Sequence, residues 1–294
     1  MESQEVLSHP PLLLKQEQRE LYFENGYLLL ENFVDENILK SLNEVTHNFI
    51  EKSRAVAQSN NIFDVAPEHS KDKPVVRRIK RPDEQHKTYW DFTCGLMADL
   101  AQDLAGPDVT FHHSKLNFKW FDESDKVQWH QDIPFFPHTN YNVFTIGCYL
   151  EDTSMTNGPV SVLPGSHNTV VYDHYDKKGN WLGAINEDNI KEIDTSKVKY
   201  LTGRAGSITI HNSRTIHSSP ASKSRRPRPV LLNCYSSADA KPYTPHPDPS
   251  INANTIVRGE RALWAHHDPR PCRIPPDWSG GYTSIYAAQA GEDK

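Results

Sequence analysis

The sequence has few cysteines and no long hydrophobic run. Its four cysteines, Cys94, Cys148, Cys234 and Cys272, lie far apart and form no Cys-x-x-Cys pair. This spacing excludes a zinc ribbon and a redox-active dithiol, and it is typical of a reducing compartment, where isolated cysteines act as small buried apolar residues. Because no stretch of about 18 apolar residues occurs, we expect no transmembrane helix.

The sequence also has no excess of basic residues and no recognisable targeting segment. A net charge of −6 argues against binding to nucleic acid or to an anionic membrane. Residues 1–11 lack the basic region and apolar run of a signal peptide, and the last residues are not a peroxisomal Ser-Lys-Leu signal. We therefore expect a cytoplasmic protein.

The first hundred residues combine helical and strand patterns. Residues 14–25 have helical spacing and are followed by Gly26, and Asp35 precedes an amphipathic helix that it is expected to cap. Two strands are predicted at residues 27–33 and 75–80, one helix at 89–104, and a loop at 60–74.

From Val109 onward, short strand patterns alternate with turns, and 21 prolines in the chain favour many irregular connections. The predicted strands cover residues 109–113, 115–121, 127–133, 142–150, 160–164, 207–211, 216–218 and 229–236. Such spacing predicts a barrel or a double-sheet jelly roll. We expect one domain over residues 1–294, with a support of helices and strands (14–106), a jelly-roll core (107–240) and a proline-rich tail near the barrel mouth (241–294). A charged insert, residues 167–201, is expected outside the core.

The strongest chemical signal is the stretch from Gln128 to Asp132. If it is a strand, His130 and Asp132 leave from the same face because they are two residues apart. A second imidazole would complete a set of two histidines and one carboxylate, which leaves positions open on a metal and suits non-haem Fe(II) oxygen chemistry. Three further His-x-Asp pairs lie in loop-like segments and begin at His174, His246 and His266.

Two residues are candidates for the second imidazole, His211 and His217, and spacing alone does not choose between them. Arg228 begins an apolar strand directly after the basic residues 223–226. A hairpin from His217 to Arg228 would place both in one cavity, where a guanidinium can bind a carboxylate through two parallel hydrogen bonds.

These segments, taken in order, resemble the phytanoyl-CoA dioxygenase family over about residues 27–240. The resemblance rests on Trp129-His130-Gln131-Asp132, Asn157-Gly158-Pro159-Val160, Leu163-Pro164-Gly165-Ser166-His167, Gly206–His211, and Ile216-His217-Ser218-Ser219 followed by Arg228. The family consists of Fe(II)- and 2-oxoglutarate-dependent oxygenases. It implies a mainly β fold with flanking helices (α+β), in which N-terminal helices pack outside a double-stranded β-helix (a cupin-like jelly roll).

By this resemblance, His130, Asp132 and His217 are the catalytic iron ligands. Arg228 is expected to bind the far carboxylate of 2-oxoglutarate, with Ser219 beside it. The family often has a basic residue on an early strand near the cosubstrate, and the candidates here are Arg78, Lys115 and Lys119. The cofactors implied are Fe(II), 2-oxoglutarate and O₂, with ascorbate as reductant.

The expected reaction is hydroxylation of an unactivated C–H bond in a small metabolite, with decarboxylation of 2-oxoglutarate to succinate and CO₂. Desaturation, cyclisation and epimerisation are alternative outcomes of the same chemistry. A jelly-roll isomerase or binding protein is an alternative of another class, because a fold does not fix a function. A halogenase is disfavoured because Asp132 stands where halogenases have a small residue. We expect a monomer or homodimer with a small-molecule substrate and no nucleic-acid or membrane partner.

Overall fold

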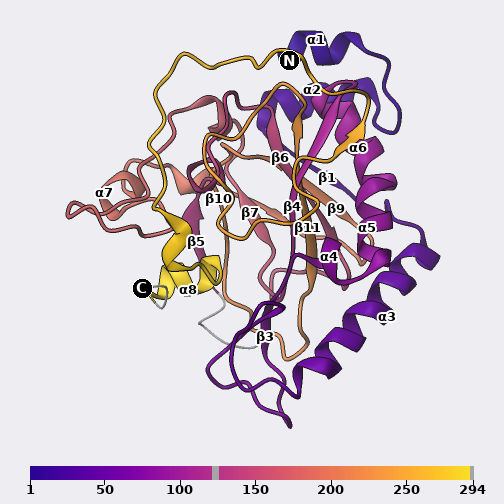
Figure 1. Ribbon diagram of the computed structural model, residues 1–294, viewed down its shortest axis with the longest axis vertical. Coiled ribbons are helices and arrows are strands. Elements are labelled where there is room, and N and C mark those ends of the chain that lie inside the picture. Colours follow the sequence, from indigo (N-terminus) through magenta and orange to yellow (C-terminus); the bar gives the residue numbers. More distant parts are fainter. Residues whose placement is uncertain (121–125, 292–294) are drawn as a thin grey trace.

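The computed structural model describes residues 1–120 and 126–291. Eight strands form the larger of two sheets, in the order β1-β9-β6-β11-β4-β3-β2, and β12 also pairs with β4 (Figure 1). Their bounds are β1 Tyr27–Leu30, β2 Phe63–Val65, β3 Val76–Lys80, β4 Val109–Asn117, β6 Val143–Tyr149, β9 Ile208–Asn212, β11 Val230–Ser237 and β12 Ile256–Arg258.

The smaller sheet has the order β5-β10-β7-β8. Its strands are β5 Val127–His130, β7 Val160–Val162, β8 Lys199–Leu201 and β10 His217–Ser219. All the pairings in both sheets are antiparallel, and the chain passes repeatedly from one sheet to the other. The predicted jelly roll is therefore confirmed.

Helices cover one side of the larger sheet, as predicted (Figure 1). These helices are α1 Ser3–Ser8, α2 Gln16–Asn25, α3 Glu36–Ser53, α4 Pro82–Gln85, α5 Lys87–Cys94 and α6 Leu96–Ala105. Two further helices, α7 Glu187–Ile190 and α8 Ile285–Ala290, lie on the other side of the molecule, where α8 contacts β5 (Figure 1). Asp35 caps α3 by accepting a hydrogen bond from the backbone N–H of Asn37. Buried residues of this helix, including Leu42 and Phe49, share one apolar core with residues of the larger sheet such as Leu116 and Ile146. None of the described helices is both long and apolar enough to cross a membrane.

The single helix predicted at residues 89–104 is wrong, because the chain forms two helices that meet at Gly95. The backbone of Gly95 leaves the helical region, with ψ of −113°. Arg258 of β12 compensates by donating hydrogen bonds to the carbonyl oxygens of Cys94 (2.8 Å) and Gly95 (3.0 Å). The break therefore depends on a residue more than 150 positions away, which local periodicity does not reveal.

One loop prediction and one strand prediction also need correction. The loop predicted at residues 60–74 contains the edge strand β2, whose Phe63 is buried in the core. The two strands predicted at 109–113 and 115–121 are one strand, β4, interrupted only by a bulge opposite Cys234 and Tyr235; the predicted end at Phe121 lies outside the described residues. The bulge adds a residue on β4 without breaking its pairing with β11.

The insert at residues 167–201 is only partly outside the core. It ends in β8, which pairs with β7, and its Ile185 packs with the buried Leu163 and Ile216. His174, also within the insert, is buried. The apolar side chains spaced between the charged residues explain why this segment packs against the smaller sheet.

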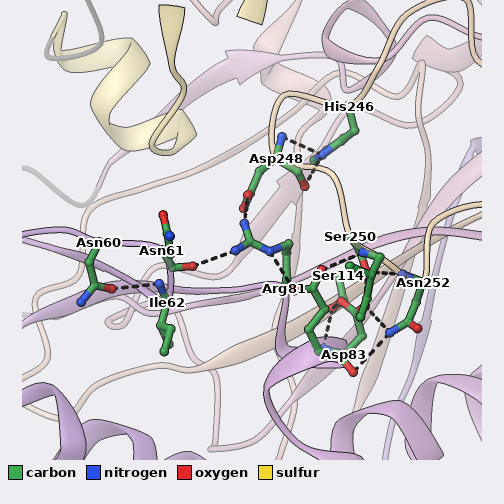
Figure 2. Close-up of polar contacts among 12 residues, drawn as sticks. Asn60, Asn61, Ile62, Arg81, Asp83, Ser114, His246, Asp248, Ser250 and Asn252 are labelled. Atoms are coloured by element: carbon green, nitrogen blue, oxygen red, sulfur yellow. Dashed lines mark hydrogen bonds and ion pairs between the residues drawn. The ribbon is translucent and has the colours of Figure 1, made fainter. Parts of the chain in front are cut away.

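The C-terminal tail is joined to the N-terminal half by a buried polar network (Figure 2). Asp83, in α4, accepts hydrogen bonds from the hydroxyls of Ser114 and Ser250 and from the amide of Asn252 (3.0 Å). Arg81 forms an ion pair with Asp248 in the same tail loop. These contacts hold residues 246–252 against the larger sheet. The proposed division of the chain at residues 107 and 241 stays a prediction.

Gly26, between α2 and β1, provides a test of this packing. Its φ is +78°, and a Cβ at this position would collide with the ring of His167 and lie 2.7 Å from Oγ1 of Thr215. Gly179 has a similar φ of +84° but open space around it. We expect Gly179→Ala to lose about 1–2 kcal/mol for the left-handed backbone and Gly26→Ala to lose a further ~1–3 kcal/mol for the collision. Urea unfolding of both variants measures the difference, and equal losses would contradict this account of the α2–β1 corner.

Candidate metal centre

His130 and His217 face each other across the smaller sheet. In the antiparallel pairing of β5 with β10, His217 lies directly opposite His130, and their ring centroids are 4.0 Å apart. Opposite residues on paired strands have neighbouring Cβ atoms, so the register alone brings the two imidazoles together. The pairing thus joins two residues that are 87 positions apart in the sequence.

Asp132 reaches the same point, but not from the strand as predicted. Strand β5 ends at His130, and Asp132 adopts a helical backbone conformation (φ −74°, ψ −33°) before a short 3₁₀ turn. Its Oδ1 nevertheless lies 3.7 Å from Nε2 of His130 and 3.8 Å from Nε2 of His217. The prediction of a shared strand face was therefore wrong, although the three side chains do converge.

The intervening residue, Gln131, explains how the chain turns out of the strand. Its fully buried side-chain amide donates to the carbonyl oxygens of Arg214 (2.7 Å) and Val170 (3.1 Å) and accepts from the backbone N–H of Tyr172 (2.8 Å). Its own backbone N–H donates to Nε2 of His174 (3.1 Å). With Gln131 held by the insert, the chain turns directly after His130 and directs Asp132 toward the two imidazoles.

Hydrogen bonds fix the orientation of both imidazole rings. Nδ1 of His130 lies 2.9 Å from the carbonyl oxygen of Gln128, and Nδ1 of His217 lies 2.9 Å from that of Thr215. A carbonyl can only accept, so each Nδ1 carries the proton and each Nε2 has a lone pair that faces Asp132. Burial lowers the pKa of His130 to about 4 and the pKa of His217 well below its usual range, so both rings are neutral.

Asp132 is held so that one oxygen faces the histidines. Its Oδ2 accepts hydrogen bonds from Oγ1 of Thr145 (3.2 Å) and from Nε2 of His211 (3.4 Å), while Oδ1 points toward His130 and His217. Burial alone would raise the pKa of Asp132, but the charge of Lys115, with smaller effects from His217 and His211, lowers it well below its usual range. The group is therefore an ionised carboxylate.

This donor set fits a divalent transition metal. His130, Asp132 and His217 each offer one ligand atom, and the three atoms lie within 4.8 Å of one another. Two neutral imidazole nitrogens and one carboxylate oxygen are the donors of the facial non-haem Fe(II) site. His211 contacts the carboxylate from outside this set, so the geometry favours His217 as the second imidazole ligand.

The three side chains open into a cavity between the two sheets. Arg228, Lys119 and Ser219 all line this cavity, and all three are buried. The predicted hairpin between His217 and Arg228 does not form, because β10 belongs to the smaller sheet and β11 to the larger. Both residues still reach the cavity, because it lies between the two sheets.

The ammonium group of Lys119 and the hydroxyl of the neighbouring Ser219 donate hydrogen bonds to different backbone carbonyls. Nζ of Lys119 donates to the backbone carbonyl of Ser219 (3.3 Å), whereas the hydroxyl of Ser219 donates to the carbonyl of Gly158 (3.0 Å). The backbones of Lys119 and Arg228 exchange hydrogen bonds of 3.2 and 2.9 Å, so the two cations enter the cavity side by side. A buried arginine beside a buried lysine is suited to binding a carboxylate.

Arg78 does not line this cavity. It lies on β3 and borders a smaller neighbouring cavity, with His113 and His246. Lys115 borders both cavities, together with Asp132. Lys115 and Asn117 on β4 and Lys119 just after it follow a period-two pattern that predicts a shared polar face, in agreement with the choice of Lys115 and Lys119 as candidates from the sequence.

Two further contacts of the site were not predicted from the sequence. They are the contacts of α8, in the tail that was expected only to lie near the barrel mouth, and the contacts of Thr145 and His211 with Asp132. Ile285 and Tyr286 of α8 line the larger cavity, so the tail closes part of its wall. Thr145 and His211 are cross-strand neighbours in the larger sheet, which is why both reach Oδ2 of Asp132. These contacts depend on strand register and tail packing, and local sequence patterns do not encode either.

A jelly roll whose inner cavity holds two neutral imidazoles, a carboxylate and a buried arginine defines a class of enzyme, the non-haem iron oxygenases that depend on 2-oxoglutarate. A family model described as "Phytanoyl-CoA dioxygenase (PhyH)" matches residues 22–230. The chain belongs to the phytanoyl-CoA dioxygenase family.

Individual relatives agree with this assignment. The chain is 35% identical over 268 residues to a probable alpha-ketoglutarate-dependent hypophosphite dioxygenase of Stutzerimonas stutzeri, an alignment that covers 88% of this chain and 91% of the relative. Crystalline EctD from S. alaskensis with 2-oxoglutarate and 5-hydroxyectoine has the same fold, with a TM-score of 0.70, 19% identity and coverage of 88% and 92% of the two chains. The carbocyclase SnoK from nogalamycin biosynthesis also shares the fold, with a TM-score of 0.60, 20% identity and coverage of 79% and 88%.

The two histidines near Asp132 should respond differently to substitution. His217→Ala removes one of three candidate ligands, so we expect iron binding to be lost. His211→Ala removes only a hydrogen bond to Oδ2 of Asp132, and loss of such an outer contact typically weakens metal affinity by about 10–100-fold. Titration with Fe(II) in the absence of O₂ measures both affinities. A weaker effect for His217→Ala than for His211→Ala would reverse the assignment.

Proposed function

We propose that the protein hydroxylates a small molecule at an unactivated C–H or P–H bond. The reaction uses one O₂ and decarboxylates one 2-oxoglutarate to succinate and CO₂. One oxygen atom enters the product and the other enters succinate, so the reaction balances. The observation that carries this proposal is the convergence of His130, Asp132 and His217 on a cavity that also holds Arg228.

In this proposal His130, Asp132 and His217 hold Fe(II). Bound iron and 2-oxoglutarate supply the oxidising chemistry, and the protein supplies binding, orientation and exclusion of water. The hydrogen bonds from His130 to Gln128 and from His217 to Thr215 keep the Nε2 lone pairs directed at the metal position.

The cationic residues of the larger cavity orient the cosubstrate. Arg228 pairs with the far carboxylate of 2-oxoglutarate, and the adjacent Lys119 adds a second positive charge at that end. Ser219 stays beside this carboxylate in the proposal, although its hydroxyl proton is directed to Gly158. Arg78, proposed from the sequence as a cosubstrate residue, borders the other cavity, so we assign the cosubstrate to Arg228 and Lys119.

The relatives support a small-molecule substrate. The relative at 35% identity is named for hypophosphite, and the neighbour of known structure was crystallised with 5-hydroxyectoine. Because a carbocyclase shares the fold, the product of this enzyme has to be identified directly. Mass spectrometry distinguishes hydroxylation, which adds one oxygen atom, from desaturation, cyclisation or epimerisation, which add none.

We further propose a cytoplasmic enzyme that acts as a monomer or homodimer. All four cysteines are free, which fits a reducing compartment. Sedimentation of the purified protein distinguishes the monomer from the homodimer.

The first test of the proposal is turnover without a substrate. Enzymes of this kind consume 2-oxoglutarate slowly when only iron and O₂ are supplied, so we expect the purified protein with Fe(II), O₂ and ascorbate to release succinate. A jelly-roll binding protein or isomerase would release none. Succinate formation no faster than in a protein-free control would therefore reject the oxygenase proposal.

The role of Arg228 has a quantitative test. Truncating one partner of a buried charge pair costs about 2–5 kcal/mol, so Arg228→Ala should raise the apparent KM for 2-oxoglutarate by roughly 30-fold or more. Arg228→Lys should recover only part of this loss, because an ammonium does not reproduce the planar two-point contact of a guanidinium.

Two neighbouring arginines provide matched controls for that measurement. Arg225 and Arg226 are exposed, and exposed ion pairs contribute about 0–1 kcal/mol, so alanine at either position should change the KM little. The readout is the dependence of succinate formation on 2-oxoglutarate for the four variants and the wild type. A normal KM in Arg228→Ala, or a large effect at Arg225 or Arg226, would remove Arg228 from the site.

A further inference from the structure

A second, smaller cavity adjoins the metal centre. Asp132 and Lys115 border both this cavity and the larger one, so the two spaces meet at the carboxylate ligand. The smaller cavity is also lined by Arg78, His113, Ser114, Phe135, Phe136, His246, Pro247, Asp248, Tyr282 and Ile285. The cosubstrate residue Arg228 does not border it, so this space is separate from the place proposed for the far carboxylate.

Two cationic side chains of this smaller cavity have N–H groups that donate no hydrogen bond to any described residue. Nε of Arg78 donates to the side-chain oxygen of Asn117 (2.8 Å), but no described residue accepts a hydrogen bond from its two terminal nitrogens. Lys115 likewise has no acceptor among the described residues for its ammonium. The next residue on β3, Arg77, differs, because it forms a 2.8 Å ion pair with the buried Asp64.

The described acidic residues that border the smaller cavity do not neutralise these two cations. Asp132 interacts with Lys115 and is also a candidate metal ligand, so its single negative charge is shared between Lys115 and a divalent cation. Asp248 forms an ion pair with Arg81. Because burying a charge whose hydrogen bonds are incomplete is costly, the buried Arg78, together with the half-buried Lys115 beside Asp132, indicates an anionic ligand in this cavity.

Two neutral histidines complete its polar wall. The rings of His113 and His246 stack with centroids 3.9 Å apart, and burial lowers the pKa of His246 to about 3. The bulge in β4 brings His112 and His113 to the same side, where their Nδ1 atoms lie 2.7 Å apart. A neutral imidazole can donate one hydrogen bond without adding a charge.

His246 is fixed in this wall by the network around the tail loop (Figure 2). Nδ1 of His246 lies 2.8 Å from the backbone carbonyl oxygen of Asp248 and 3.0 Å from its backbone nitrogen, and Asp248 is paired with Arg81. Ser250 and Asn252 bind Asp83 on the far side of the loop. The wall is therefore preorganised by contacts that the metal centre does not need.

We propose that this cavity binds the oxyanion group of the substrate, and that the group is a small oxyanion of phosphorus. Its polar lining comes from three separate elements, with Arg78 on β3, Lys115 and His113 on β4, and His246 in the tail loop. A tetrahedral anion presents oxygens in several directions and matches donors arranged in this way, whereas a planar carboxylate presents two oxygens in one plane. The relative named for hypophosphite is consistent with this chemistry.

The inference rests on the proposed function, because it places the oxyanion next to the iron. The substrate therefore has two parts. One is the oxyanion, held by Arg78 and Lys115, and the other is a P–H or adjacent C–H bond directed toward the metal position. The contact of both cavities at Asp132 provides this proximity.

The test is calorimetric binding to the protein loaded with Fe(II) and 2-oxoglutarate in the absence of O₂, so that no turnover is needed. Three ligands are compared: hypophosphite, methylphosphonate and acetate. We expect at least one of the two phosphorus oxyanions to bind at least about tenfold more tightly than acetate. Equal or tighter binding of acetate, or no binding of either phosphorus oxyanion, would overturn the proposal.

Crossed variants then locate the binding site. Arg78→Gln should weaken phosphorus oxyanion binding about tenfold or more, since a hydrogen bond to a charged group contributes about 1.5–3 kcal/mol. It should weaken 2-oxoglutarate binding less than it weakens oxyanion binding, and Arg228→Gln should do the opposite. Arg78→Lys should restore part of the oxyanion affinity. If Arg78→Gln weakens 2-oxoglutarate binding more than oxyanion binding, Arg78 belongs to the cosubstrate and the proposal fails.

The loading step separates this inference from the proposed function. A wild-type protein that does not bind Fe(II) and 2-oxoglutarate together contradicts the oxygenase proposal and, with it, this one. A wild-type protein that binds both but not the phosphorus oxyanions contradicts only the oxyanion site.

Discussion

The register of β10 against its two neighbours is the constraint on which the site depends. His217 is paired with His130 on one side and with Val162 of β7 on the other, so the strand is fixed from both edges. Side chains alternate between the two faces of a strand, and a shift by one residue would turn the imidazole away from the cavity. The metal centre is therefore a product of sheet pairing rather than of a local loop.

The second requirement is that positive charge is buried close to one carboxylate. Lys115 is the largest favourable influence on the ionised state of Asp132, and it borders both cavities. Lys119 and Arg228 enter the larger cavity beside it. Three cationic side chains therefore lie close to one carboxylate in the interior.

The sequence was sufficient to predict the parts of the site that depend on local patterns. The aromatic and β-branched residues around His130 predicted a strand, and the basic turn before an apolar run singled out Arg228. Spacing alone left His211 and His217 open, the family resemblance favoured His217, and the pairing of β10 with β5 supplies the physical reason. The position of Asp132 needed the long-range hydrogen bonds of Gln131. The split at Gly95 likewise depended on Arg258. In each case, a tertiary contact overrode the local periodicity.

The C-terminal tail is synthesised after the candidate metal ligands. By the time Ser237 has been synthesised, all the candidate metal ligands and every strand of both sheets except β12 are already present in the nascent chain. His246, Ile285 and Tyr286, which close the two cavities, follow later. Domains generally begin to fold from the N-terminal side during synthesis. The candidate metal ligands are therefore synthesised before the tail residues that close the walls of both cavities.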